Sequence, residues 1–410
     1  MSFFGSRWVE APAHAREASG LPAGFRAAGV RAGIKPSGEP DVGLLVSDAS
    51  ETASAARFTR SGVLAAPVLT CMERCDLGAL RAIAANAGNA NAATGRAGLD
   101  AAAKMQGAGA MVAGVSETQV AVASTGVIGV QLPADRVVKG LAQAARELAA
   151  DGDGAFADSI RTTDAFPKRA SLEVTLPSGT VRLAAQAKGA GMISPALATL
   201  LCFVQTDAAL SAETAELLLS VTSKRSFERV SVDGQLSTND TVILMASGAS
   251  GVRVEPETPD EIAFGEALDA LMRQLALLVV ADGEGATRVG RVVVHGGHEL
   301  HVEGAARAVA NSPLVKTALN GGDANWGRVA QAVGMALPGT SPLPLDIAIE
   351  GVQVCAGGAA VPHDEAALGE AVNGREVEYA IGLPGEGAEA EVFFSDLGHG
   401  YVTINAEYTT

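Results

Sequence analysis

The segment from Lys188 to Thr199 is the part of this chain whose residue types and spacing most clearly suggest catalytic chemistry. It reads KGAGMISPALAT and is followed at once by the apolar run LLCFV. The glycines predict a bent loop, and the apolar run predicts a buried strand that begins directly after Thr199. A hydroxyl in this place would be held still beside a cleft. A plain Gly-rich turn between two strands, with Thr199 as an ordinary strand residue, fits the same spacing.

The chemistry that this placement allows is that of an internal nucleophile. The hydroxyl of Thr199 would attack the carbonyl carbon of the preceding residue, the peptide bond would shift to an ester, and water would release a new amino terminus. A free α-amino group has an ordinary pKa of about 8, so its neutral form could act as the base for the adjacent hydroxyl. Such a nucleophile needs no distant histidine.

Other polar residues have both an ordinary and a chemical interpretation. The pair Thr125-Gly126 sets a hydroxyl beside the backbone N–H of a small residue, and an oxyanion needs two converging donors of that kind. A glycine turn that ends a strand fits the pair equally well. On local sequence alone, Lys188 would be a solvated surface lysine, Glu284 a solvent-facing acid and Thr162 a turn hydroxyl.

The cysteine and histidine spacings predict no metal site. Cys71 and Cys75 are four positions apart, but no second Cys/His pair stands at zinc spacing, so they are interpreted as small buried hydrophobic residues. His295, His298 and His301 surround a Gly-Gly turn and are interpreted as loop histidines. Four cysteines in so long a chain make no disulfide framework, which favours a reducing, cytoplasmic location.

The elements that must position these residues are helices and strands in mixed order. Apolar residues at three-and-four spacing predict helices over residues 99–112, 133–150, 211–222, 262–280, 303–320 and 364–372. Strict alternation over 172–176 and 181–185, with the turn 177–180 between them, predicts a β-hairpin. Alternation over 345–349 and 377–381 predicts strands with one wet face.

The order of elements predicts an α+β fold of layered antiparallel sheets packed with helices. The regular strand-helix-strand rhythm of a doubly wound parallel sheet is missing, and no fixed-period repeat is present. The loop 255–261, rich in proline and acidic residues, is the clearest charged connector, and we expect a surface loop there rather than a domain linker.

The composition excludes several classes of function. The 410 residues contain 30 Lys plus Arg against 46 Asp plus Glu, a formal net charge of −16, so there is no surplus of cations to bind a nucleic-acid backbone. The longest apolar run, 275–281, is far shorter than the roughly 20 residues that cross a bilayer. No secretory signal is visible at the amino terminus. We expect no nucleic-acid or membrane partner.

The chain resembles the glutamate N-acetyltransferases, also called ornithine acetyltransferases, which are bifunctional enzymes of arginine biosynthesis. The segment Lys188–Thr199 is similar to their self-cleavage site, and the resemblance extends over nearly the whole chain. The other matching blocks are NAGNAN at 86–91, STGVIG at 124–129, SVDG at 231–234, STNDT at 237–241, DGEGAT at 282–287, NSPLVK at 311–316, NWGR at 325–328 and NAEYTT at 405–410.

This resemblance implies a self-cleaving fold of the N-terminal-nucleophile type. Cleavage between Ala198 and Thr199 would give an α chain of residues 1–198 and a β chain of residues 199–410, packed as one catalytic unit and assembled as α2β2 or larger. N2-acetylornithine would acetylate Thr199, ornithine would leave, and glutamate would take the acetyl group in a ping-pong reaction. No metal or cofactor takes part, although some members accept acetyl-CoA as a second donor.

The resemblance also assigns the supporting residues. Thr125 and Gly126 would form the oxyanion hole, and the substrate-binding residues would be Thr162, Lys188, Thr199, Glu284, Asn405 and Thr410. Lys188 could meet the α-carboxylate of an amino acid, and Glu284 could attract the second amine of ornithine. Thr163 is an alternative to Thr162. The matches at Asn405 and Thr410 imply a carboxyl terminus that folds back over the pocket.

The family pattern has Asn-Met before the Ala-Thr pair, whereas this chain has Ala196-Leu197, a departure that concerns the rate of cleavage.

Two rival functions stay open on the sequence. A self-processing aminopeptidase or amidohydrolase of the same architecture would pass the acyl group to water instead of glutamate. A small-molecule binding protein would keep the fold without processing itself.

Overall fold

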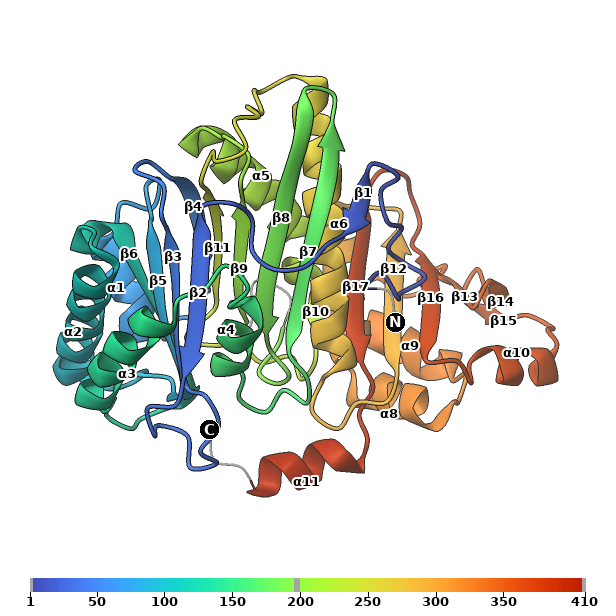
Figure 1. The fold of residues 1–410 in the computed structure, drawn as a ribbon. Coiled ribbons are helices and arrows are strands. Elements are labelled where there is room, and N and C mark those ends of the chain that lie inside the picture. The colour runs from blue at the N-terminus through green and yellow to red at the C-terminus, as the bar shows by residue number, and fades with distance from the viewer. Residues whose placement is uncertain (1–2, 195–199, 408–410) are drawn as a thin grey trace.

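A computed structural model describes residues 3–194 and 200–407 of the chain. These residues form three β-sheets with helices around and between them (Figure 1). The sheets have four, six and seven strands, and each contributes apolar side chains to a buried core. Within the described residues, none of the helices has the length and apolar character that crossing a membrane requires.

The four-stranded sheet lies at one end of the molecule and has the order β2-β3-β5-β6. Its strands are β2 (Phe25–Val30), β3 (Val42–Ser47), β5 (Ala82–Asn89) and β6 (Val120–Val127). Its helices are α1 (Ala66–Arg74), α2 (Gly95–Ala113), α3 (Ala134–Glu147) and the short α4 (Asp153–Ser159), with the 3-10 turn η1 (Glu117–Gln119) before β6. The helices α1, α2 and α3 cover the outer face of this sheet (Figure 1).

The six-stranded sheet lies in the middle and has the order β1-β7-β8-β9-β11-β4. Its strands are β1 (Ala15–Glu17), β4 (Ala53–Phe58), β7 (Lys168–Leu176), β8 (Gly179–Lys188), β9 (Leu201–Thr206) and β11 (Thr241–Ala246). Both faces are buried, because Leu201 and Phe203 pack toward the four-stranded sheet while Cys202 and Val204 pack with α5 (Ala212–Arg225) and α6 (Pro259–Ala281). This two-sided burial explains why β9 is apolar at every position from Leu201 to Val204.

The seven-stranded sheet forms the other end and has the order β10-β17-β12-β16-β13-β14-β15. Its strands are β10 (Val230–Ser231), β12 (Val289–His295), β13 (Asp346–Ile349), β14 (Val352–Ala356), β15 (Ala359–Ala360), β16 (Glu376–Gly382) and β17 (Glu389–Ser395). Its helices are α7 (Glu299–Asn311), α8 (Pro313–Gly321), α9 (Trp326–Ala336) and α10 (Glu365–Ala371), and the 3-10 turn η2 (Phe227–Arg229) precedes β10. Helix α11 (His399–Glu407) runs beneath the sheets, back toward the four-stranded sheet (Figure 1).

The layered α+β fold predicted from the sequence is confirmed, and the structure adds detail to the pairing of its strands. The predicted hairpin is β7–β8, with Leu172 opposite Leu183. The predicted helix over 262–280 is α6. The sheets are mixed rather than purely antiparallel, since β5 pairs with β6, β9 with β11, β12 with β16 and β10 with β17 in parallel. Parallel neighbours are joined by long connections rather than by hairpin turns, and alternation of side chains does not reveal their direction.

The boundary predicted between the α and β chains, at Ala198 and Thr199, lies outside the described residues. Strands from both sides of that boundary share the central sheet, because β8 pairs antiparallel with β9 and Lys188 stands opposite Leu201. Neither predicted chain therefore contains a complete central sheet.

Candidate active site

A polar cavity of about 200 Å³ opens where the ends of the four- and six-stranded sheets face α11. Its walls come from the end of β6, the loop before β7, the end of β8, the loop between β10 and β11, the turn after α6, and α11. Six residues predicted as site residues line this one cavity: Thr125, Gly126, Thr162, Lys188, Glu284 and Asn405. Thr163 lines it as well, so the choice between the two threonines stays open.

The end of β6 holds Thr125 and Gly126 in a tightly packed position. Gly126 has a φ of 130°, and a Cβ there would come within 2.4 Å of the backbone of Gly88 on β5, so only glycine fits. The Thr125 hydroxyl oxygen accepts a hydrogen bond from Lys188 Nζ at 3.2 Å. A hydroxyl can donate one hydrogen bond while it accepts others, and no acceptor for the Thr125 proton is found among the described residues.

Lys188 is buried, so the surface interpretation that its local sequence suggested is wrong. Its side chain is 2% exposed, and Nζ donates to Thr125 Oγ1 at 3.2 Å and to Thr162 Oγ1 at 2.8 Å. Burial lowers the pKa of this amine, and the nearby charge of Asp164 opposes that shift. The two hydroxyl bonds fix the ammonium at the cavity wall between Thr125 and Thr162.

Behind Lys188, a buried carboxylate pair binds a second lysine. Asp164 accepts from Lys168 Nζ at 2.7 Å and from the Gly189 N–H at 2.7 Å, and Lys168 also reaches Asp282 Oδ2 at 2.5 Å. Burial alone would raise the pKa of Asp164, but the charges of Lys168 and Lys188 and these hydrogen bonds bring it well below its usual range. Asp164 therefore stays ionised and stabilises the charge on Lys188, 3.9 Å away.

The opposite side of the cavity is acidic. Glu284 follows α6, is 8% exposed, and accepts a hydrogen bond from Asn405 Nδ2 of α11 at 2.7 Å. Its backbone N–H donates to Ala190 O at 2.9 Å, which draws it against the Gly-rich loop. A Cβ at Gly191 would lie 2.7 Å from the Glu284 carboxylate, so this glycine is what allows the close approach.

Asp233 is a second carboxyl of this acidic wall, and the sequence assigned it no role. Its oxygens accept the backbone N–H groups of Met192 at 2.7 Å and Ile193 at 2.9 Å, and Tyr401 of α11 points its hydroxyl toward it at 3.5 Å. Burial raises the pKa of Asp233, and the neighbouring charge of Glu284 raises it further. A fixed cation on one wall and two carboxyls on the other suit an amino-acid ligand, whose carboxylate and amine need opposite partners.

Three predicted residues, Ala198, Thr199 and Thr410, lie outside the described residues. On the described side of the predicted cleavage site, Met192 lines the cavity. On the other side, the Leu200 N–H donates to Asp240 Oδ1 at 2.9 Å.

The loop between β10 and β11 supplies wall residues that sequence reasoning missed. Gln235, Ser237, Thr238 and Asn239 line the cavity together with Asp233. The blocks SVDG and STNDT stood out in the sequence, and their run of polar residues directly before an apolar strand is the signal that could have placed them here. Nothing in the sequence marked Tyr401.

The described residues contain no group of three or more His, Cys, Asp or Glu side chains arranged to hold a metal ion. Cys71 and Cys75 contact the backbone of β6, where their thiols bond to Val122 O and Val120 O. His298 caps α7 by accepting the Leu300 N–H at 3.2 Å.

Comparisons with known proteins give a consistent result. The model of the ArgJ family matches residues 26–410. Relatives named "Arginine biosynthesis bifunctional protein ArgJ" include one from Symbiobacterium thermophilum, 42% identical over 393 residues, which is 95% of this chain and 98% of the relative. One from Deinococcus radiodurans is 43% identical over 395 residues, again 95% of this chain and 98% of the relative.

Among solved structures, an ornithine acetyltransferase from Mycobacterium tuberculosis, complexed with ornithine, is 38% identical with a TM-score of 0.41. The match spans 44% of the chain described here and 98% of the chain in the Mycobacterium tuberculosis structure.

Proposed function

This chain belongs to the ArgJ family, and from that premise we propose how its cavity carries out acetyl transfer in arginine biosynthesis. The chain is an acetyltransferase of that pathway, as its relatives over nearly the full length are. The reaction that fits the cavity moves an acetyl group from N2-acetylornithine to glutamate.

The observation that carries the proposal is the convergence of distant residues on one cavity. Thr125, Thr162, Lys188, Glu284 and Asn405 come from five separate parts of the chain. Lys188 is fixed by Thr125 and Thr162, while Glu284 is fixed by Asn405 on the other side. An α-carboxylate beside Lys188 and the side-chain ammonium of ornithine beside Glu284 would set the acetyl amide between them.

The first half-reaction acetylates Thr199. After cleavage between Ala198 and Thr199, the neutral α-amine takes the hydroxyl proton while the oxygen attacks the acetyl carbonyl carbon. The Thr125 hydroxyl and the Gly126 N–H donate to the oxyanion that develops. The tetrahedral intermediate collapses by breaking the amide C–N bond, and the proton passes to the departing ornithine amine.

The second half-reaction runs the same steps toward glutamate. Its neutral amine attacks the acetyl ester of Thr199, the oxyanion forms against the same two donors, and the Thr199 oxygen leaves. The proton lost by the glutamate nitrogen returns through the α-amine to the Thr199 hydroxyl. N2-acetylglutamate is the product, and the enzyme is restored.

The remaining parts of the proposal concern assembly and donors. The cleaved chains 1–198 and 199–410 stay together and assemble as α2β2 or a larger oligomer in the cytoplasm. The shared central sheet supports the first point, because β8 and β9 belong to different chains after cleavage. The reaction uses no cofactor, and acetyl-CoA is an alternative donor to be tested in the same assay.

The decisive experiment compares the wild-type protein with Thr199→Ala. Wild-type protein should run as two fragments on a denaturing gel and form acetylglutamate from acetylornithine and glutamate. Thr199→Ala should stay at full length and form none. Wild-type protein that remains at full length would favour an unprocessed binding protein, and fragments of Thr199→Ala would refute the assignment of the nucleophile.

A second arm separates transfer from hydrolysis. The enzyme is incubated with acetylornithine, with and without glutamate, and free acetate is measured. We expect acetate release to be small and acetylglutamate to form only with glutamate. Equal acetate release in both incubations would instead favour an amidohydrolase.

A further inference from the structure

The cavity has one acidic wall, and two ligands with opposite side-chain charges must use it in turn. In the proposed function, ornithine leaves with an ammonium at the end of its side chain, and glutamate then enters with a carboxylate at that place. Lys188 on the opposite wall can bind the α-carboxylate that both amino acids share. The side-chain carboxylate of glutamate would then lie against Asp233 and Glu284, where two negative charges would repel it.

Asp233 is held at this wall by backbone groups. Its Oδ1 accepts the N–H groups of Ile193 at 2.9 Å and Gln235 at 3.1 Å, and its Oδ2 accepts the Met192 N–H at 2.7 Å. The Tyr401 hydroxyl reaches Oδ2 at 3.5 Å, which is the limit of a hydrogen bond. Oδ2 can therefore exchange this long contact for a proton, or for a hydrogen bond to a ligand in the cavity, without losing its backbone donor.

Glu284 is the second carboxyl of this wall, and the two acids contact neighbouring residues of one short loop. The Glu284 carboxylate lies 2.7 Å from the Cβ position of Gly191, and the next residue, Met192, donates to Asp233. Tyr401 lines the cavity together with both acids. Two carboxyls around one small cavity disfavour double ionisation unless a cation lies beside them.

We infer that Asp233 is a specificity-determining residue that changes its protonation state between the two half-reactions. Beside the side-chain ammonium of ornithine it is ionised. Beside the side-chain carboxylate of glutamate it takes one proton from solvent and donates a hydrogen bond to that carboxylate. The proton returns to solvent when N2-acetylglutamate leaves and acetylornithine binds. The inference rests on the proposed function, because only an enzyme that exchanges ornithine for glutamate needs this change.

The electrostatics of the wall agree with this role. Burial raises the pKa of Asp233, the charge of Glu284 raises it further, and the three backbone N–H groups act in the opposite direction. An ammonium beside Asp233 would lower this pKa, and a further carboxylate would raise it. The other titratable groups on the elements that surround the pair are Lys188 of β8, Lys316 of α8, His399 and Tyr401 of α11, Asp240 before β11, Asp282 after α6 and Asp396 after β17.

Two five-carbon probes separate the two side-chain charges. Glutarate is glutamate without its α-amine, and 5-aminovalerate is ornithine without its α-amine, so the probes share one carboxylate and differ only at the far end. Neither probe titrates between about pH 6 and about pH 9, because carboxyls titrate near about 4.3 and amines near about 10.4. Enzyme groups near the shared carboxylate, such as Lys188, affect both probes alike and cancel in the ratio of their dissociation constants.

Calorimetric titration of the purified wild-type enzyme measures both dissociation constants without turnover. We expect the ratio of the constant for glutarate to that for 5-aminovalerate to rise at least about tenfold between about pH 6 and about pH 9, because proton uptake accompanies only the binding of glutarate. Titrations in buffers of different ionisation enthalpy should show this uptake directly, and none for 5-aminovalerate. A ratio that stays constant with pH would overturn the inference.

Two variants locate the proton. Asp233→Asn removes the titrating group, so the ratio should no longer depend on pH. Glu284→Gln keeps every backbone bond of Asp233 and supplies the test even where D233N fails to fold. Without the charge of Glu284, the rise of the ratio should begin at least about one pH unit lower. The wild-type pH dependence in either variant would overturn the inference.

Asp207→Asn is the matched control. Asp207 follows β9 directly, is 5% exposed, and accepts the Arg182 N–H at 2.7 Å, so D207N removes a buried carboxylate away from the cavity and should keep the wild-type ratio at every pH. A change in D207N as large as that in D233N would also overturn the inference. Wild-type protein that forms no acetylglutamate from acetylornithine and glutamate would refute the proposed function, whereas an active enzyme with a constant ratio refutes only the role of Asp233.

Discussion

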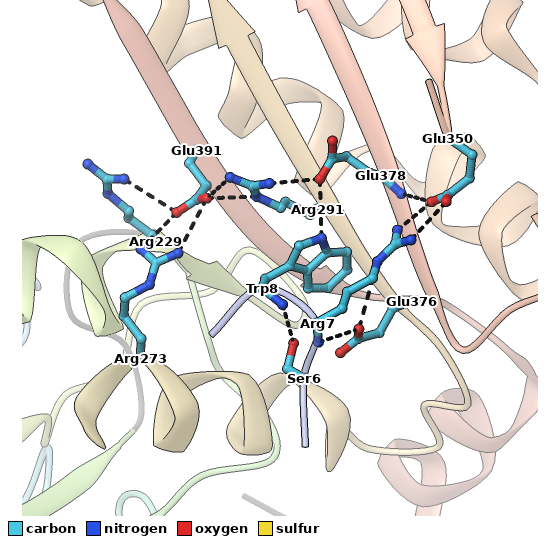
Figure 2. Close-up of polar contacts among 10 residues, drawn as sticks. All are labelled: Ser6, Arg7, Trp8, Arg229, Arg273, Arg291, Glu350, Glu376, Glu378 and Glu391. Carbon is cyan, nitrogen blue, oxygen red and sulfur yellow. Dashed lines mark hydrogen bonds and ion pairs between the residues drawn. The ribbon is translucent and has the colours of Figure 1, made fainter. Parts of the chain in front are cut away.

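Two clusters of buried charge differ in whether their charges are fully paired. The site cluster consists of Asp164, Lys168, Lys188 and Asp282, and its innermost lysine is completely buried. The arginine–glutamate network joins the seven-stranded sheet to α6 and to the segment before β1 (Figure 2). Its members are Arg7, Arg229, Arg273, Arg291, Glu350, Glu376, Glu378 and Glu391.

The network pairs each of its carboxylates with at least one guanidinium. Glu391, which is 4% exposed at its side chain, faces Arg229 at 3.4 Å, Arg273 at 3.0 Å and Arg291 at 2.5 Å. Arg291 continues to Glu378 at 2.7 Å. Four arginines and four glutamates therefore balance one another (Figure 2).

The site cluster is paired on one side only. Lys168 is bound between two aspartates, whereas Lys188 donates its hydrogen bonds to two neutral hydroxyls, has Asp164 3.9 Å away, and lines the cavity. The two clusters therefore contribute differently. Balanced charges that bind one another hold elements together, whereas a buried cation whose hydrogen bonds go to neutral hydroxyls at a cavity wall keeps its charge available for a ligand.

The largest expected effect separates the two clusters by activity. Lys188→Met removes the cation at the cavity wall, while Asp164 keeps Lys168 and the Gly189 N–H. We expect kcat/KM to fall about 10³-fold, equivalent to about 4 kcal/mol of lost transition-state stabilisation. Steady-state kinetics with acetylornithine and glutamate measure this loss.

The matched control is Arg291→Met, the same change of a partly buried cation in the arginine–glutamate network. It should leave kcat/KM of the folded protein within about twofold of wild type. A loss of activity as large as that of Lys188→Met would break the distinction between the clusters.

The second effect tests the network by stability. Glu391→Gln leaves three guanidinium groups beside a neutral side chain, and breaking a buried ion pair in this way costs about 3 kcal/mol. Urea denaturation should show the loss, while kcat/KM of the folded fraction stays at the wild-type value. An unchanged free energy of unfolding would show that the network is dispensable.

The same variant should change the acid sensitivity of the fold. Burial would raise the pKa of Glu391, but the charges and hydrogen bonds of Arg273 and Arg291 outweigh it and lower the pKa. A carboxyl with a lowered folded pKa stabilises above its unfolded pKa of about 4.3, and the contribution is lost as the pH falls through the folded value. Wild-type stability should therefore decline below about pH 4, and Glu391→Gln should decline less.

The sequence predicted the wet face that carries this network but not its pairing. Val377, Tyr379 and Ile381 are buried and alternate with the half-exposed Glu376, Glu378 and Ala380, which marks the other face of β16 as solvated. That Arg291 stands opposite Glu378 depends on a parallel register between strands far apart in the chain. Local periodicity has no information on such a register.

The residues of the cavity could be predicted from the resemblance to a known family rather than from periodicity. The blocks that carry this resemblance assigned Thr125, Lys188 and Glu284 to one function, and the structure brings the three residues together around one cavity. The burial of Lys188 could not be predicted, because its partner Asp164 stands 24 positions earlier in a loop without a distinctive pattern. Asp233 escaped assignment because a carboxylate in a polar loop is ordinarily solvated.

The third effect concerns α11, which closes the acidic wall from outside. Asn405→Ala removes the amide that donates to Glu284 at 2.7 Å, while no residue of α11 is buried. A hydrogen bond to a charged group contributes about 1.5 kcal/mol, so KM for acetylornithine should rise about tenfold. The melting temperature should not change, because little apolar surface depends on this helix.

Thr403→Ala is the control on the same helix. Its hydroxyl donates within α11 to His399 O at 3.2 Å and does not line the cavity. An equal rise of KM in both variants would mean that α11 acts through its helicity rather than through Asn405.

The smallest effect lies at the exposed end of the arginine–glutamate network, at Arg7. Its guanidinium binds both oxygens of Glu350, at 2.9 and 2.5 Å, but 45% of its side chain is exposed. Water and salt screen such a pair, so Arg7→Ala should cost less than about 1 kcal/mol of unfolding free energy and leave kcat/KM unchanged. The backbone N–H of Arg7 still reaches Glu376 at 3.1 Å in the variant, which limits the loss further.

Salt dependence sharpens this last prediction. Raising the ionic strength to about 1 M shortens the screening length to about 3 Å, so the difference between wild type and Arg7→Ala should nearly vanish. Arg7→Lys keeps the charge but cannot bind both carboxylate oxygens in one plane, and it should fall between the two. A loss above about 2 kcal/mol, unchanged by salt, would mean that Arg7 belongs energetically with the buried part of the network, and exposure would then fail to separate its two ends.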